Sequence, residues 1–181
     1  MNGTSWEKSK VLTPLKKDFL KEFFAIEGRF FLTGGSALGI FYFDHRVSYD
    51  LDFFTVNKDI DWKHVESNLH VVCRKIEAKI EPITKSPSFQ RFQLTRNKEH
   101  EIIDFVIEWV EQINPQKNVI DGIRVDTLEE IGINKICTLL GRTEIKDIID
   151  LYFLSKNGFD IITDFDMAMK IVGVFYTATL S

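Results

Sequence analysis

The feature that most restricts the fold is a pair of aspartates, Asp50 and Asp52, inside the apolar and aromatic run at residues 49–56. The run predicts a β-strand, and because side chains alternate between its faces, both aspartates leave one face while Leu51 and Phe53 leave the other. On a strand that rises about 3.3 Å per residue, the two Cα atoms lie roughly 7 Å apart. Carboxylates at this spacing can converge on a hard cation such as Mg²⁺, whose octahedron is completed by water and phosphate oxygens.

A glycine turn precedes this strand. Residues 29–33 form a short apolar run that predicts another strand, and the run ends in Gly34 and Gly35. Ser36 follows and is well placed to cap a short helix. Glycines let the backbone approach a ligand closely, and amides at a helix N-terminus favour an anion, so this turn is a candidate triphosphate site.

A third acid, Asp104, interrupts the apolar strand predicted at residues 101–109. Burial of a carboxylate is costly unless a metal ion or hydrogen bonds compensate for it. Asp104 is therefore a candidate third metal ligand, or the base that activates an attacking hydroxyl. The polar turn at residues 96–100 joins this strand to another one, predicted at residues 89–95, as a hairpin.

Helical periodicity and turn signals predict the remaining elements. Apolar residues three or four apart indicate helices at residues 13–27 and 61–80, and a second turn is marked by Asp121-Gly122. The last third of the chain reads as helical throughout, with Gly158 as a candidate helix end.

Length and composition favour a self-sufficient globular fold. The chain has 181 residues, of which 44% are hydrophobic and 28% charged, enough to bury a core without staples. The expected class is α+β, with a mixed sheet and flanking helices over residues 1–126 and a small helical region packed on it over residues 127–181. Cys73 and Cys137 show no CxxC pairing and are expected to be buried, reduced thiols.

Charge and hydropathy limit the partners and the location. A formal net charge of -4 argues against nucleic-acid binding by bulk electrostatics. Lys10, Lys16, Lys17 and Lys21 predict the solvated face of the N-terminal helix, or a contact with an acceptor RNA. The sequence opens without an apolar leader, and no apolar run approaches the roughly 18 residues of a membrane span, so a cytoplasmic location is expected.

Each of these motifs alone is weak, because alternating aspartates most often mark a solvated strand face. Their joint order is more specific, and it resembles a known family. The stretch LTGGSALGIFYFDHRVSYDLDFF is similar to the GGTAL...HRxSxDLDFF signature of AbiEii/AbiGii-type nucleotidyltransferase toxins, which belong to the polymerase-β-like superfamily. The stretch NKICTLLGRTEIKDIIDLYFL resembles that family's helical motif, and the two stretches stand in the family's order over residues 30–156.

The resemblance implies a polymerase-β-like fold and transfer of a nucleoside monophosphate from a nucleoside triphosphate to an acceptor hydroxyl, which in studied relatives can be the tRNA 3′ end. It implies two Mg²⁺ ions at Asp50 and Asp52, with Asp104 matching only by its place in the strand order. It also implies a toxin of a toxin-antitoxin or abortive-infection system, with a cognate antitoxin protein. The other matching positions are Gly34, Gly35 and Ser36 for the triphosphate, Arg46 and Ser48 for shaping the nucleotide site, Lys135 and Asp150 for catalysis, and Arg142 and Asp147 for nucleotide binding.

Alternatives remain open beside this interpretation. The acceptor could be a small cationic molecule, as in antibiotic-modifying nucleotidyltransferases, or a protein, or the chain could bind nucleotide without turnover. Lys135 and Arg142 could form only a solvated basic stripe. The chain is also shorter than many family members and has Ser36 where threonine is commoner, so the resemblance does not define acceptor recognition.

Overall fold

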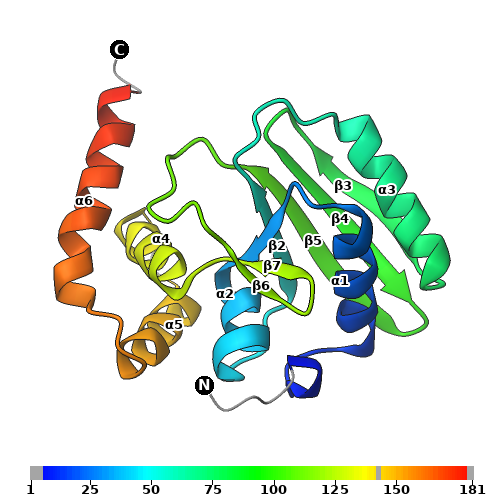
Figure 1. Cartoon of the computed structure of the whole chain (residues 1–181), viewed down its shortest axis with the longest axis horizontal. Helices are drawn as coiled ribbons and strands as arrows, with labels where there is room; N and C mark the ends of the chain where they lie inside the picture. Colours follow the sequence, from blue (N-terminus) through cyan, green and yellow to red (C-terminus); the bar gives the residue numbers. More distant parts are fainter. Residues whose placement is uncertain (1–5, 142–143, 179–181) are drawn as a thin grey trace. The chain divides into compact units, whose positions relative to one another are not determined.

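A mixed β-sheet carries the candidate site in the computed structural model, which describes residues 6–141 and 144–178 (Figure 1). The strands are β1 (Phe31–Thr33), β2 (Asp50–Thr55), β3 (Lys79–Lys85), β4 (Phe89–Arg96), β5 (Glu99–Ile107), β6 (Asn118–Ile120) and β7 (Ile123–Val125). They form one seven-stranded sheet in the order β3-β4-β5-β2-β1-β7-β6. The pairs β2/β5 and β1/β7 are parallel and the other neighbours are antiparallel, so the expected α+β class with a mixed sheet is confirmed.

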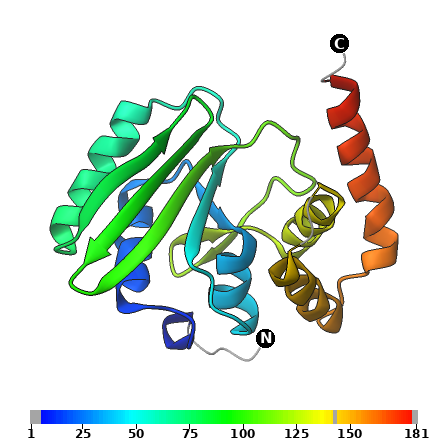
Figure 2. The same ribbon diagram turned by 180° about the vertical axis from the view of Figure 1, so that it is seen from behind.

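Two helices, α1 (Pro14–Ile26) and α3 (Trp62–Lys75), lie on the same face of this sheet (Figure 1). An aromatic cluster fills the interface, with the Phe23 ring of α1 centred 4.9 Å from that of Phe53 and 5.5 Å from that of Phe105. The opposite face of β3, β4 and β5 is turned to the viewer in Figure 2. The strand alternation predicted from sequence therefore holds: Leu51 and Phe53 are buried beneath the helices, and the aspartates of β2 leave the other face.

The helix after the glycine turn begins earlier than the sequence predicted. Gly34 has a φ of +68°, which turns the chain directly from β1 into the short helix α2 (Gly34–Ala37), and η2 (Leu38–Phe43) continues it as a π-helix. Thr33 holds the N-cap position, so the expectation that Ser36 caps this helix is wrong. Ser36 lies inside the helix, where its hydroxyl donates to the Thr33 carbonyl oxygen at 3.3 Å.

The helix predicted at residues 61–80 ends at Lys75, where the sequence suggested that it would continue. Glu77 takes a φ of +55°, and the chain turns back into the edge strand β3, which the sequence did not predict. Most of β3 is exposed on both faces, so its side chains show neither helical nor strand periodicity. The hairpin of β4 and β5, and the Asp121-Gly122 turn between β6 and β7, are confirmed.

Three helices form a second compact unit: α4 (Leu128–Gly141), α5 (Ile145–Lys156) and α6 (Ile161–Ala178). This unit also contains Val110–Gln116, whereas Lys117–Asp126 belongs with the sheet. α4 contacts both α5 and α6, and Phe159 packs so closely on Gly132 that a methyl group there would collide with its ring. The proposed boundary after residue 126 stays a prediction. Within the described part of the chain, no helix combines the length and the apolarity that a membrane span requires.

Candidate active site

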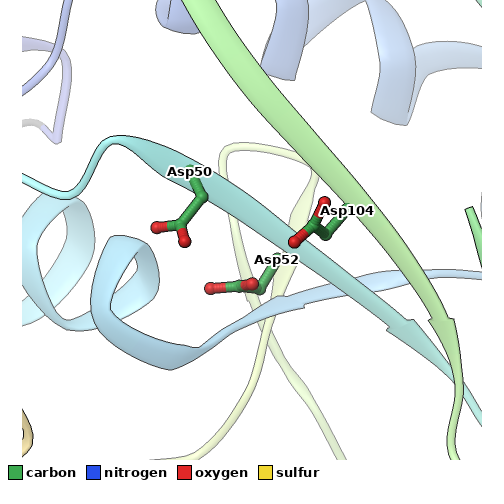
Figure 3. A group of neighbouring side chains, drawn as sticks. All are labelled: Asp50, Asp52 and Asp104. Atoms are coloured by element: carbon green, nitrogen blue, oxygen red, sulfur yellow. The ribbon is translucent and has the colours of Figure 1, made fainter. Parts of the chain in front are cut away.

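Three carboxylates converge on the face of the sheet that α1 and α3 leave free. Asp50 and Asp52 leave β2, and Asp104 leaves the neighbouring parallel strand β5 directly opposite Asp52 (Figure 3). One carboxylate oxygen from each residue lies within 4.8 Å of those of the other two. Asp104 is buried and the other two are half-buried. The sequence-predicted acids are thus brought together at one point.

This set of donors fits a divalent cation. Three like charges at such short separation repel one another, and a cation between them removes that repulsion. Carboxylate oxygens are hard ligands of the kind that Mg²⁺ and Mn²⁺ prefer. Asp50, Asp52 and Asp104 are therefore the residues that could hold such an ion.

Arg91 on β4 also meets this cluster, although the sequence analysis did not identify it. Its Nε donates to Asp104 Oδ1 at 2.7 Å and its Nη2 donates to Asp104 Oδ2 at 2.6 Å. The hydrogen bond to Asp104, and the negative charges of Asp104, Asp50 and Asp52, raise the pKa of Arg91. The turn predicted at residues 96–100 would have placed Phe92 opposite Asp104. The structure has a two-residue turn at Asn97 and Lys98, and this register places Arg91 there instead.

The glycine turn lies against the acids and has no room for side chains. A Cβ atom on Gly34 would stand 2.8 Å from Asp52 Oδ2, and the positive φ there already disfavours any other residue. A Cβ atom on Gly35 would collide with the Arg46 guanidinium. The structure therefore brings Gly34, Gly35 and Arg46 to the same site as Asp52.

Asp50 is held by a chain of hydrogen bonds that reaches into α1. The Ser48 hydroxyl donates to Asp50 Oδ1 at 2.8 Å, and the Ser48 carbonyl accepts from Lys16 Nζ at 2.5 Å. Lys16 also pairs with Glu101 at 2.9 Å, and Glu101 accepts a second hydrogen bond, at 2.7 Å, from Thr13. Ser48 thus orients a predicted metal ligand.

The same contacts correct the expectation for the lysines of α1. Lys16 is 2% exposed, so its placement on a solvated or RNA-binding face is wrong. Its long side chain turns beneath the helix to reach Ser48 and Glu101, which periodicity within α1 could not reveal. Lys17 and Lys21 are more exposed and both pair with Glu7. Hydrogen bonds from Lys21 and Lys17 lower the pKa of the Glu7 carboxyl to about 2.

In the helical unit, Lys135 pairs with two aspartates of α5. Its Nζ lies 2.8 Å from Asp147 Oδ1 and 2.8 Å from Asp150 Oδ2. All three residues are buried, so the alternative of a solvated basic stripe is wrong for Lys135. Asp147 Oδ2 has no hydrogen-bond partner within the described part of the chain. Arg142 lies outside the described residues.

Comparisons with known proteins bear on the family and the fold of this chain. Residues 18–176 match the model of a family described as "Nucleotidyl transferase AbiEii toxin, Type IV TA system". No curated protein matches the chain. The crystal structure of JHP933 from Helicobacter pylori is 28% identical, with a TM-score of 0.60, and the match covers 80% of this chain and 64% of JHP933. The chain thus spans less than two thirds of the JHP933 chain.

Two further solved structures share the fold. One is an H. pylori protein described as a nucleotidyltransferase, with 23% identity, a TM-score of 0.61, and coverage of 87% of this chain and 80% of that one. The other is MenT4, a nucleotidyltransferase toxin from Mycobacterium tuberculosis, with 14% identity, a TM-score of 0.52, and coverage of 80% and 57%. At these identities the likeness concerns the fold alone.

Proposed function

Because this chain belongs to the AbiEii family of nucleotidyl transferase toxins, we propose that it transfers a nucleoside monophosphate from a nucleoside triphosphate to an acceptor hydroxyl. The observation that carries the proposal is the convergence of Asp50, Asp52 and Asp104 beside the glycine turn. A triphosphate needs cations that neutralise its charge, which the three carboxylates could hold, and close contact with the backbone, which the glycine turn allows.

Mg²⁺ is the proposed cofactor, held as a two-metal site by Asp50, Asp52 and Asp104. When bound, such ions neutralise charge on the reacting phosphate and stabilise the attacking and leaving oxygens. Ser48 fixes the orientation of Asp50, which keeps that carboxylate in place for its ligand role. Asp104 remains the proposed base for the acceptor hydroxyl, a role for which its oxygens must be free of Arg91.

The triphosphate is proposed to bind at Gly34, Gly35 and Ser36, with Arg46 beside it. The guanidinium of Arg46 lies against Gly35, where it could pair with phosphate oxygens. Further contacts are assigned by family resemblance to the helical region, with Lys135 and Asp150 in catalysis and Arg142 and Asp147 in nucleotide binding. The buried position of Lys135 between two carboxylates means that its first role is to compensate their charge.

The proposed acceptor is a polynucleotide, with tRNA as the first candidate, and the proposed partner is a cognate antitoxin in the cytoplasm. Support for tRNA comes from the family resemblance. The lysines of α1 add little to it, since Lys16 is buried and Lys17 and Lys21 are paired with Glu7.

The acceptor can be identified by incubating the purified protein with Mg²⁺ and each of the four α-labelled triphosphates. Total tRNA, a protein mixture and an aminoglycoside would be offered as acceptors in separate reactions. Label on tRNA supports the proposal. Label only on protein or on the aminoglycoside would overturn the tRNA assignment and leave nucleotidyl transfer in place, whereas no label on any acceptor would count against the activity itself.

A further inference from the structure

Arg91 is joined to the acidic cluster through a single carboxylate. It lies directly opposite Asp104 across the β4/β5 ladder and grips both oxygens of that carboxylate at 2.7 and 2.6 Å. Within the described part of the chain, all side-chain hydrogen bonds of Arg91 go to Asp104. Bidentate pairs of this kind are among the strongest hydrogen-bonded contacts in proteins. Without a metal ion, Arg91 therefore supplies the countercharge that the buried Asp104 requires.

The exposure of Arg91 distinguishes its pair with Asp104 from two other ion pairs that involve buried acids of the same unit. Asp126 pairs with Lys117 and Glu101 pairs with Lys16, and the lysine side chains are only 3% and 2% exposed. The Arg91 side chain is 41% exposed, although that of Asp104 is only 7% exposed. If its ion pair with Asp104 opens, the Arg91 guanidinium can therefore be hydrated by solvent. If either lysine lost its carboxylate partner, its ammonium group would remain buried without a compensating charge.

Phe89, on the same strand, offers the Arg91 side chain a second contact besides Asp104. The Arg91 guanidinium stands 5.6 Å from the centroid of the Phe89 ring, within range of a cation–π contact. This contact does not involve Asp104, so opening of the ion pair does not by itself remove it.

The acidic cluster cannot satisfy Arg91 and a divalent ion equally well. An ion bound among Asp50, Asp52 and Asp104 would repel the nearby guanidinium and draw on the same carboxylate oxygens. We propose that Arg91 is an internal counter-cation, which holds Asp104 in the absence of metal, competes with a divalent ion for that carboxylate, and so sets the metal affinity of the site. The inference rests on the metal site of the proposed function. It makes Arg91 a positioning residue that acts through Asp104.

Calorimetric titration of the full chain with Mn²⁺ tests this competition. Replacement of Arg91 by glutamine removes the competing charge, so Arg91→Gln should bind Mn²⁺ roughly tenfold more tightly than the wild type. Arg91→Lys keeps the charge but not the bidentate contact, so its Mn²⁺ affinity should lie between those of the wild type and Arg91→Gln. Arg96→Gln is the matched control, because Arg96 lies on the same strand but pairs with Asp18 and Glu99, and its Mn²⁺ affinity should not change.

The outcomes separate this inference from the function on which it rests. Equal Mn²⁺ affinity in Arg91→Gln and the wild type, or weaker binding in the variant, overturns the competition and leaves the metal site intact. No saturable binding in either protein overturns the metal site and the inference together.

A second measurement follows Arg91 in the wild-type protein by NMR spectroscopy. The Nε–Hε resonance of Arg91, assigned by its absence from Arg91→Lys, should shift as Mg²⁺ is added to the wild type, because its hydrogen bond to Asp104 opens. A resonance that stays unchanged at saturating Mg²⁺ overturns the inference.

Discussion

Gly34 is the residue at which backbone geometry and site chemistry meet. Alanine at its φ of +68° should cost about 1–2 kcal/mol of unfolding free energy, and its methyl group would press on Asp52. Gly122 is a matched control, since its φ is +83° and a methyl group there would meet nothing within 4 Å. Urea unfolding should show a loss of stability in both alanine variants, and the loss at Gly34 should be at least as large as that at Gly122. Only Gly34→Ala should also lose Mn²⁺ affinity, and an equal effect at Gly122 would contradict the role assigned to Gly34.

Lys135 illustrates how a single buried charge can confuse a catalytic assignment. Removal of its ammonium leaves Asp147 and Asp150 buried without their cation, so Lys135→Ala should lose roughly 3–5 kcal/mol of unfolding free energy. Lys146→Ala removes an exposed pair with Glu144 and should lose at most about 1 kcal/mol. Denaturant unfolding of both variants measures the difference. If Lys135→Ala were as stable as Lys146→Ala, the buried charge of Lys135 would not contribute to stability. Any loss of activity in Lys135→Ala would then indicate a catalytic role alone.

Among the elements, α1 is tied to the site by Lys16 rather than exposed to an acceptor. Lys16→Met should lose about 3 kcal/mol of unfolding free energy, because Glu101 would keep only its hydrogen bond from Thr13. Lys17→Met, at a partly exposed pair with Glu7, should lose less than about 1 kcal/mol. Thermal unfolding of the two variants checks this. Similar melting temperatures would show that the Lys16 network is not what anchors the segment before β2.

The elements also show which parts of the fold the sequence could predict. The sequence predicts elements that bury one face and expose the other, because such elements have a periodic apolar pattern. Examples are α1, β2 and the β4/β5 hairpin. The edge strand β3 was missed because neither of its faces is buried enough to impose a pattern.

Some residues of the candidate site can likewise be predicted from local sequence patterns, and others cannot. Asp50 and Asp52 are neighbours in the chain, so local spacing was enough to pair them, and an isolated acid in an apolar strand was enough to single out Asp104. The contacts of Arg91 and Lys16 depend on strand register and on the path of a long side chain across elements. No local pattern encodes those contacts, so they became visible only in the structure.

For the molecule as a whole, the balance of 23 basic and 27 acidic residues limits how it can hold an RNA. Binding of tRNA must then depend on a few local cations, and each phosphate contact should contribute about -0.7 to -0.9 to the slope of log affinity against log salt. A filter-binding titration between about 50 and 200 mM salt should give a slope equivalent to only a few contacts. Affinity independent of salt would argue against a polynucleotide acceptor.

The nature of the transferred group is the final question at the level of the whole enzyme. Wild-type protein and Asp52→Asn should be incubated with Mg²⁺, acceptor and a triphosphate labelled at either the α- or the γ-phosphate. The carboxylate site predicts that the wild type transfers α-label and no γ-label, and that folded Asp52→Asn transfers neither, since it has lost a metal ligand. Transfer of γ-label by the wild type, or near-normal transfer of α-label by Asp52→Asn, would contradict a nucleotidyl transfer centre at these acids.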